Sequence, residues 1–336
     1  MIYFGTLFDR NYLSRALVLF DSLKENCPEF IFFALCLDDT AFEYIKKEQL
    51  IHAEIIPIHI RDLELQDEDL RKSRLNRTII EYYFTISPCL ALYLIQKFNL
   101  PHICTLDADL LFYSNPTFIF KEIENYSVII TPHKFSPEII HGEKYGRFNV
   151  SFQIFKNDDS GLACLRKWRT QCINWCKDVY DDQTGFFADQ KYLDGWPELL
   201  GKKLLVLNDP QTGIAVWNVN RFKIEKRLNI FYSNGHPLVF YHFHGFKVLS
   251  SSFAANEFLV YKVKKTKTLL YLYQYYWGRL KVRQAGFDCS TRVNLPKNLF
   301  LKIVNARAVF FHSELVGLFC YIKIPNFFKR IFFINK

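Results

Sequence analysis

Two carboxylates, Asp107 and Asp109, carry the sharpest chemical signal in this sequence. They flank Ala108 between the apolar runs HICTL and LLFY. Residues i and i+2 of an extended segment point to the same side, so the two carboxylates can hold one hard divalent cation. Carboxylates in apolar surroundings need a metal or basic partners to offset their desolvation. A solvated acidic turn is the alternative interpretation, and the apolar flanks favour a metal site.

A second signal lies in the segment YHFHGFK, directly after the apolar residues PLVF. His242 and His244 share one side of an extended segment, and Gly245 lets the backbone approach a ligand closely. Neutral imidazole joins carboxylates around Mn²⁺-like ions, and Lys247 offers a point charge to phosphate. A structural histidine is the alternative for either ring.

The elements that position these residues follow an α/β pattern. Over the first 245 residues, short β-type runs alternate with helical patterns, which is typical of a layered α/β fold. The continuous apolar run Phe30–Leu37 predicts a strand covered on both faces, and Pro57 places the strand Ile55–Ile60 at or near an edge. We expect further strands over Ile2–Thr6, His102–Leu106, Val128–Thr131, Val150–Phe155, Leu204–Asn208 and Leu238–Phe243.

Two helices are predicted from apolar spacing and end signals. Ser14 is expected to cap the first, and the second is expected over about Ser87–Phe98. No stretch reaches the ~18 apolar residues that a bilayer requires, so we predict no membrane-spanning helix. The N-terminus has no basic region before its apolar residues, which predicts no signal peptide and a cytoplasmic protein.

The nine cysteines are odd in number and have no framework spacing, which favours reduced, buried thiols over disulfides. Cys172 and Cys176 are one helical turn apart and fall on the same apolar stripe as Trp168. This pattern predicts core packing, because a free cysteine packs like a small hydrophobe. A shared metal is the alternative.

Charge is distributed unevenly along the chain. Residues 261–336 hold 15 Lys and Arg against two acids, a net charge of +13, so the rest of the +9 chain carries −4. Such a basic, aromatic extension suits a polyanion: an anionic lipid surface, a nucleic acid or a charged partner. Apolar residues on one face of the segment 326–333 favour the lipid surface, and packing of the aromatic residues on the body is the alternative.

Five segments together resemble a known enzyme family: FGTLFDRNYL, CTLDADLLFYSNP, FNVSFQIF, FADQKYL and FYHFHGFK. They resemble the GT-A-fold glycosyltransferases, in particular the group of the bacterial lipopolysaccharide galactosyltransferases and glycogenin (glycosyltransferase family eight). The likeness to uncharacterised members from surface-polysaccharide loci is greater still. It covers about residues 1–250. It implies a mixed, mostly parallel sheet flanked by helices, with a catalytic domain over 1–255 and an extension over 256–336.

The resemblance also implies roles for the two signals. Asp107 and Asp109 match the metal-binding DxD, and His242 matches the histidine of the family's HxxGxxK, so all three are expected to ligate Mn²⁺ or Mg²⁺. Gly245 keeps the family spacing. Lys247 lies one position early, and it is expected beside the donor diphosphate.

Further residues match the family's donor and reaction segments. Thr6, Asp9 and Tyr12 fall where the nucleotide base and ribose are expected. Asn149 matches the asparagine that approaches the sugar and acceptor. The pair Asp189-Gln190 resembles the DQ pair beside the anomeric carbon, although Asp189 is alternatively a helix cap.

The chain departs from the family pattern ahead of the DxD. Where the galactosyltransferases carry an arginine in a YARL-like helix, this chain reads Ser87-Pro88-Cys89-Leu90. The corresponding contact to the donor sugar is then missing or supplied by another residue, for which Arg77 is the candidate. Transfer of galactose in particular is therefore not implied.

The sequence thus predicts a metal-dependent glycosyltransferase that uses a nucleotide sugar, with a UDP-sugar favoured, and a glycan or lipid-linked acceptor. We expect it on the cytoplasmic face of the membrane as a peripheral protein in lipopolysaccharide or capsule synthesis. One alternative is a nucleotidyltransferase that makes activated sugars, although FGTLFDRN is a poor glycine-rich phosphate loop. The other is a nucleic-acid-binding protein using the basic extension, which lacks a recognised nucleic-acid motif.

Overall fold

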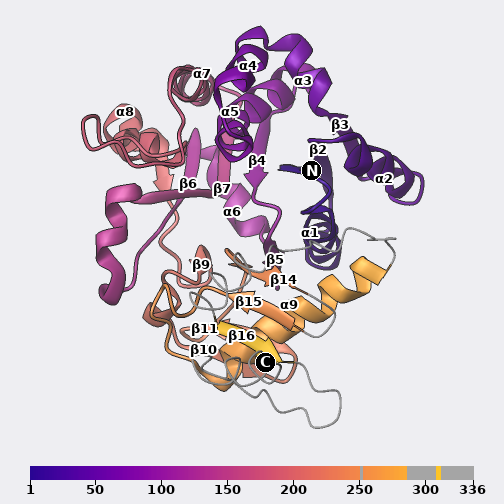
Figure 1. Cartoon of the computed structure of the whole chain (residues 1–336), viewed down its shortest axis with the longest axis vertical. Coiled ribbons are helices and arrows are strands. Elements are labelled where there is room, and N and C mark those ends of the chain that lie inside the picture. The colour runs from indigo at the N-terminus through magenta and orange to yellow at the C-terminus, as the bar shows by residue number, and fades with distance from the viewer. Residues whose placement is uncertain (250–252, 286–307, 312–336) are drawn as a thin grey trace, which may run out of the picture.

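The chain folds around a seven-stranded mixed sheet, as the computed structural model shows (Figure 1). The structure describes residues 1–249, 253–285 and 308–311. The strand order is β3-β2-β1-β4-β7-β6-β8. The strands are β1 (Ile2–Phe8), β2 (Phe30–Cys36), β3 (Ile55–His59), β4 (His102–Leu106), β6 (Val128–Pro132), β7 (Phe148–Lys156) and β8 (Leu204–Val206).

Most of the neighbouring strands in this sheet run parallel. Strands β1, β2 and β3 pair in parallel, as do β1 with β4 and β6 with β8, whereas β7 is antiparallel to β4 and to β6. The mixed, mostly parallel sheet predicted from the sequence is therefore confirmed. Its carboxyl-terminal edge, where β1 and β4 both end, is the usual ligand side of an open α/β sheet.

Helices cover both faces of the sheet because its strands are apolar on both sides. In β2, Phe32 and Ala34 face one hydrophobic cluster, while Phe33 and Leu35 face another. The first cluster includes α1 (Leu13–Asn26), α2 (Asp39–Gln49) and α6 (Thr117–Lys121). The second includes α3 (Ile60–Gln66), α4 (Glu68–Ser73), α5 (Ile79–Phe98), α7 (Asp159–Asn174) and α8 (Trp196–Leu200).

Helix α5 is longer than the sequence pattern predicts. It begins at Ile79 rather than near Ser87, because Thr78 and Glu81 form a capping box, and Pro88 lies inside it. By length and composition alone α5 would be long enough to cross a membrane, but 56% of its apolar window is buried inside the protein. It packs against α7 and β4, so in this fold it is a core helix.

Two other boundaries differ from expectation, and one is confirmed. Helix α1 begins at Leu13, so the residue at its cap position is Tyr12 and not Ser14, which is buried in the first turn. The strand predicted over Leu238–Phe243 is short, and it belongs to a second sheet. Strand β3, which contains Pro57, lies at the edge of the main sheet as predicted.

Three small sheets and a long helix form a second layer beneath the main sheet (Figure 1). One sheet has the order β5-β13-β9 and touches α1 through β5. The strands are β5 (Leu110–Phe112), β9 (Ile214–Ala215), β10 (Ile224–Arg227), β11 (Ile230–Ser233), β12 (His236–Pro237), β13 (Phe240–His242), β14 (Lys247–Val248), β15 (Phe253–Asn256) and β16 (Ala308–Phe311). The helix is α9 (Lys267–Ala285).

Helix α9 packs its aromatic residues into the body of the protein. Tyr273, Tyr276 and Trp277 are buried in one cluster with Phe243, the residue after β13. The rings of Tyr276 and Phe243 stack with their centroids 3.9 Å apart. In the described part of the basic extension, the aromatic residues therefore pack on the body of the protein, which was the alternative to binding a lipid surface.

Ion pairs fasten the outer side of α9 to α1 and α2. Arg279 makes two hydrogen bonds to the Glu25 carboxylate, at 2.6 and 2.7 Å. Arg283 pairs with Asp21 and also reaches Glu48 at 3.4 Å. Two basic residues of α9 are thus engaged within the protein. The predicted lipid-facing segment 326–333 lies outside the described residues.

All seven cysteines in the described part of the chain are buried free thiols. Cys172 and Cys176 lie in the same apolar cluster as Trp168, with α5 and α7. The predicted core packing of this pair is confirmed.

We predict that Tyr276→Ala destabilises the protein far more than Tyr271→Ala. Tyr276 is fully buried and stacked on Phe243, so its truncation leaves a large cavity and costs about 3–5 kcal/mol of unfolding free energy. Tyr271 is 42% exposed on the same helix and serves as the matched control. Urea unfolding of both variants measures the difference, and equal stability of the two would show that α9 is not part of the core.

Candidate functional site

The carboxyl end of β4 places Asp107 and Asp109 at the centre of the main sheet. Strand β4 lies between β1 and β7. The chain turns directly after it: the Asp107 N–H donates to the Ser151 carbonyl at 3.0 Å, and the Leu110 N–H donates to the Asp107 carbonyl at 3.3 Å. This turn leads into β5, so the two carboxylates lie where the main sheet meets the second layer.

Strand β13 brings His242 to the same place. It pairs antiparallel with β5, with His242 opposite Leu110. The next residue, Phe243, donates its N–H to the Asp109 carbonyl at 3.0 Å. The backbone hydrogen bonds thus fix the imidazole beside the acidic turn, although 133 residues of chain separate His242 from Asp109.

Asp107, Asp109 and His242 form a compact cluster, with one potential ligand atom from each residue within 4.8 Å of the others. The His242 Nε2 atom lies 3.0 Å from Asp109 Oδ1 and 3.6 Å from Asp107 Oδ2. His242 and Asp109 are buried, whereas the Asp107 side chain is 41% exposed. The cluster is therefore open to solvent on the Asp107 side.

The electrostatics of the cluster reflect two carboxylates sharing one site. Although the Asp107 side chain is partly exposed, desolvation by the surrounding protein raises its pKa; the attraction of His242 opposes this effect, and the neighbouring Asp109 adds to it. Burial alone would lower the pKa of His242, but the two carboxylates outweigh it and raise that pKa. Without a cation, a proton bound within the cluster of Asp107, Asp109 and His242 relieves the repulsion between the two carboxylates. A divalent cation would do the same more completely.

His244 lies beside this cluster but points elsewhere. Its Nε2 atom is 3.6 Å from Glu257 Oε2, and the side chain is 43% exposed. Gly245 follows with φ +68°, and a Cβ atom there would lie 2.4 Å from the Glu257 Cδ atom. The positive φ favours glycine at this turn, and a larger residue there would displace the Glu257 carboxylate. Lys247 is exposed at the start of β14.

Strand β1 delivers the first predicted donor segment to the same edge of the sheet. It runs parallel to β4, with Thr6 opposite Leu106, and ends two residues further on at Phe8, so both strands lead to the same edge of the sheet. Thr6 is buried, and Tyr12 is 38% exposed. Between them, the Asp9 carboxylate orders the loop by accepting the N–H groups of Asn11 and Tyr12 at 2.9 and 3.2 Å.

Arg15 is a residue near the site that the sequence analysis missed. Its side chain is buried, with Nη2 donating to the Phe246 carbonyl at 2.9 Å and Nη1 to the Asn11 carbonyl at 3.2 Å. The guanidinium also lies over the Tyr12 ring, 4.3 Å from its centroid. Arg15 therefore ties the loop after β1 to the segment around Gly245. A basic residue inside the apolar stripe of α1 was the available signal.

Asp189 and Gln190 lie at the start of a short 3-10 helix, Gln190–Gly195. Asp189 is buried and makes no side-chain capping hydrogen bond, so a helix cap does not account for it. The preceding residue, Ala188, has φ +47°, a strained conformation for alanine. The Gln190 amide donates to the Tyr145 carbonyl at 3.0 Å.

Ser87, in the Ser87-Pro88-Cys89-Leu90 segment that departs from the family pattern, lies beside Asp189 and acts to lower the pKa of that carboxyl. Burial, with a smaller contribution from Asp107, raises the pKa of Asp189 to about 7 against this effect of Ser87. The arginine of the family pattern corresponds to Cys89, which is buried in the apolar cluster of α5 and α7, so this chain has no charged group at that position. Arg77, the suggested substitute, is engaged elsewhere: it donates to the Cys172 and Ile173 carbonyls at the end of α7.

Asn149 is buried in β7, where the pairing with β6 is irregular. Its carbonyl oxygen accepts from Thr131 Oγ1 at 3.0 Å and from the Ser151 N–H at 3.1 Å, and its amide donates to the Pro132 carbonyl at 3.3 Å. These bonds support the backbone of β6 and β7. The predicted contact of Asn149 with sugar and acceptor stays a prediction.

The fold and the site now define the class of protein. Among solved structures, the chain is similar to the galactosyltransferase LgtC in complex with donor and acceptor sugar analogues, with a TM-score of 0.52. The match covers 84% of this chain and 96% of LgtC at 13% sequence identity. The protein therefore has the GT-A fold of glycosyltransferases, as predicted.

Sequence relatives define the family more narrowly. The chain is 29% identical to YfnD of Bacillus subtilis (strain 168) over 281 residues, which cover 83% of this chain and 88% of YfnD. It is 30% identical to YfnF of the same organism over 254 residues, which cover 73% of this chain and 82% of YfnF. The chain belongs to the family of YfnF. Both relatives are uncharacterised proteins. No family model matches the chain.

We predict that Asp189→Asn stabilises the protein increasingly as the pH rises. Because the folded-state pKa of Asp189 is raised to about 7, folding favours the protonated carboxyl, and stability falls as the pH rises from about 4 towards 7. The variant does not titrate there, so its advantage over wild type should grow by about 1–3 kcal/mol between pH 5 and pH 8.5. Denaturant unfolding in chelator measures this advantage.

Asp182→Asn, an exposed substitution in the preceding loop, is the control and should show no such growth. An advantage of Asp189→Asn that stays constant across this pH range would contradict the assigned burial effect.

Proposed function

We propose that this protein is a metal-dependent glycosyltransferase that moves a sugar from a nucleotide-diphosphate sugar to a glycan or lipid-linked acceptor. The observation that carries the proposal is the Asp107–Asp109–His242 cluster at the carboxyl edge of a GT-A sheet. Fold alone does not assign an activity, because one fold supports many. The position and the chemistry of this cluster favour glycosyl transfer among those activities.

The three side chains fit a hard divalent cation such as Mn²⁺ or Mg²⁺. Carboxylate oxygens and a neutral imidazole are the donor set that suits these ions. The repulsion between the carboxylates is the energetic reason for a cation there. When bound, the cation would stabilise the negative charge that develops on the departing diphosphate. Lys247 and the backbone at Gly245 are the proposed further contacts to that diphosphate.

The nucleoside is proposed to lie against the loop after β1, in contact with Thr6, Asp9 and Tyr12, with a UDP-sugar as the favoured donor. This loop begins at the edge of the sheet where the acidic cluster lies. Arg15 donates hydrogen bonds to the Asn11 carbonyl in this loop and to the Phe246 carbonyl. It would therefore hold the proposed nucleoside and diphosphate contacts in fixed positions relative to each other.

Transfer requires the bond between the sugar's anomeric carbon and the diphosphate oxygen to break while the acceptor oxygen bonds that carbon and loses its proton. Asp189 is proposed to position the acceptor hydroxyl or take its proton, and its raised pKa near neutrality suits proton transfer. Gln190 would stabilise positive charge on the anomeric carbon. Asn149 and Arg77 remain proposed contacts to sugar and acceptor, Arg77 only if it gives up a bond to α7.

Peripheral attachment to an anionic membrane is part of the proposal, supported by the +13 charge of residues 261–336. In the described part, Lys264 pairs with Glu138 at 3.0 Å, and Arg279 and Arg283 pair with α1. We therefore predict salt-sensitive binding that residues 286–336 mainly supply. Liposome flotation tests this: truncation after Ala285 should abolish binding, and wild type that fails to bind at low salt would disprove attachment.

We predict that Asp107→Asn and Asp109→Asn each lower sugar transfer at least about 100-fold, because each loses one hard ligand. A panel of nucleotide sugars with Mn²⁺, followed by release of free nucleoside diphosphate, first identifies the donor. Thermal melting should show both variants folded, with Asp109→Asn melting lower than Asp107→Asn. Asp107→Asn removes a carboxylate whose pKa the site raises, whereas Asp109→Asn gives up the ion pair with His242.

Asp67 and Asp69 both pair with Arg169, but the Asp67 side chain is largely buried, whereas the Asp69 side chain is 62% exposed. Asp69→Asn is therefore the control and should keep wild-type activity. Wild-type activity in chelator would defeat metal dependence. Formation of a nucleotide sugar from a sugar phosphate and a nucleoside triphosphate would instead support the nucleotidyltransferase alternative.

We predict that His242→Ala raises the Mn²⁺ concentration required for activity about tenfold or more, while His244→Ala changes it much less. His242 contacts both carboxylates, whereas His244 pairs with Glu257. Metal titrations of nucleotide-sugar hydrolysis in both variants measure this. A greater effect of His244→Ala would overturn the assignment of His242 as the ligand.

A further inference from the structure

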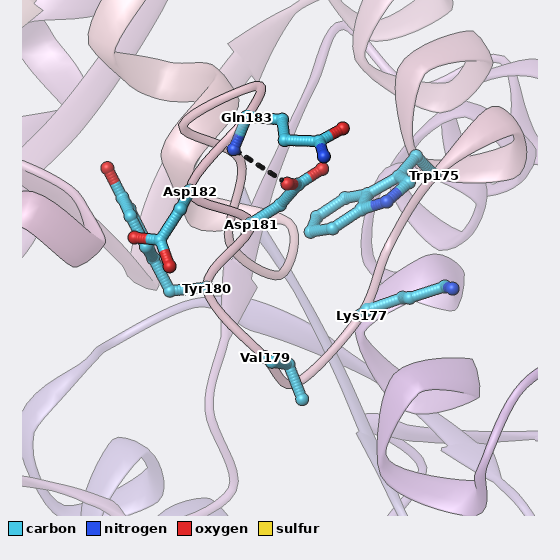
Figure 2. A pocket seen from close by; sticks show the side chains of 7 residues that line it. All are labelled: Trp175, Lys177, Val179, Tyr180, Asp181, Asp182 and Gln183. Atoms are coloured by element: carbon cyan, nitrogen blue, oxygen red, sulfur yellow. Dashed lines mark hydrogen bonds between the residues drawn. The ribbon is translucent and has the colours of Figure 1, made fainter.

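A pocket of about 380 Å³ lies in the loop between α7 and Asp189. Its volume is at the lower end of the ~300–1,000 Å³ range of small-molecule sites. Figure 2 shows the rings of Trp175 and Tyr180 on different sides of the loop, with the Asp182 side chain beside Tyr180 and the Gln183 amide on the side of Trp175. The pocket is lined by Trp175, Lys177, Val179, Tyr180, Asp181, Asp182 and Gln183.

The loop that forms this pocket is held in shape by its own hydrogen bonds. Asp181 donates its N–H to the Phe186 carbonyl at 3.0 Å and accepts the Gly185 N–H at 2.7 Å. Its carboxylate accepts from the Gln183 N–H at 2.9 Å and from Thr184 Oγ1 at 2.8 Å. Asp181 therefore orders the loop, and Asp182 and the Gln183 amide are among the lining polar groups that can meet a ligand.

The pocket is connected directly to the residues proposed to react. The Ala188 N–H, immediately before Asp189, donates to the carbonyl of Lys177 at 2.9 Å. The Tyr145 ring contacts Tyr180 with centroids 5.8 Å apart, and the Tyr145 carbonyl accepts the Gln190 amide at 3.0 Å. A ligand in the pocket is thus next to the strained turn that carries Asp189 and Gln190.

We propose that this pocket is a subsite for a sugar residue of the acceptor glycan, which rests on the proposed glycosyltransferase function. Partly exposed aromatic rings offer apolar faces to the C–H face of a pyranose ring. A carboxylate and an amide at the same pocket offer hydrogen bonds to its hydroxyl groups. The donor contacts proposed above lie on other segments, so this loop is available to the acceptor.

The charges around the pocket are balanced. Asp181 and Asp182 line it together with Lys177, and the Lys144 Nζ atom lies 5.3 Å from the centroid of the Tyr180 ring. Such a site matches a sugar without strong net charge, so the proposed ligand is a hexose or hexosamine residue.

Fluorescence provides a binding test that does not depend on activity. Trp175 is partly exposed, while the other four tryptophans, Trp168, Trp196, Trp217 and Trp277, are at most 4% exposed. Acrylamide quenching of the full chain therefore reports chiefly on Trp175. Methyl glucoside and glucosamine should each reduce quenching in a saturable manner.

Two variants and a matched control locate the binding. Tyr180→Leu and Asp182→Asn should each weaken protection by methyl glucoside about tenfold, with melting temperatures confirming that the loop's neighbours stay folded. Asp178→Asn removes an acid from the same loop but outside the pocket, and should leave protection unchanged. Equal protection in all three variants, or none in wild type, would overturn the subsite.

Donor hydrolysis measured in the same samples separates this inference from the proposed function. Wild type that hydrolyses a nucleotide sugar but gains no protection from either sugar refutes the subsite and leaves glycosyl transfer intact. Wild type that is protected but hydrolyses no nucleotide sugar refutes the transferase function and with it the acceptor role of the pocket.

Discussion

The contact between Asp109 and His242 holds the rest of the site in place. It joins the acidic turn after β4 to strand β13, and the 3.0 Å separation of Asp109 Oδ1 and His242 Nε2 is supported by the Phe243 hydrogen bond to the Asp109 carbonyl. Asp107 adds a second carboxylate to the same space. Two like charges in a largely buried site are stable only with a compensating positive charge, which is why we infer a cation.

This constraint explains why the second layer is built as it is. His242 is far from Asp109 in the sequence, so β13 must be held at the edge of the main sheet by other elements. Strand β5 pairs with β13, and the buried rings of α9 pack against Phe243, the residue after it. Arg15 then fixes the following turn to the loop after β1. The basic extension, at least through α9, thus serves the site by packing against the segment that carries its histidine.

Much of the fold and the Asp107–Asp109–His242 cluster could be predicted from the sequence, because these features depend on local patterns. A few neighbouring residues are enough to recognise each of these features: the apolar run of β2, the edge position of Pro57, and the DxD and HFHG segments. Helix α5 was predicted too short because Pro88 is a strong local signal, whereas the capping box at Thr78 and burial against α7 outweigh it. The roles of Ala188 and Arg15 could not be predicted from the sequence. The positive φ of Ala188 and the hydrogen bond from Arg15 to the Phe246 carbonyl arise only from tertiary contacts.

The most direct test of the account is a crystal of the full chain soaked with Mn²⁺ and UDP, with anomalous scattering recorded at the manganese edge. We predict one strong peak in bonding contact with Asp107, Asp109 and His242, with the diphosphate on its solvent side towards Gly245 and Lys247. A peak elsewhere on the protein, or no peak at a saturating Mn²⁺ concentration with the nucleotide bound, would contradict the central claim that this cluster is a cation site.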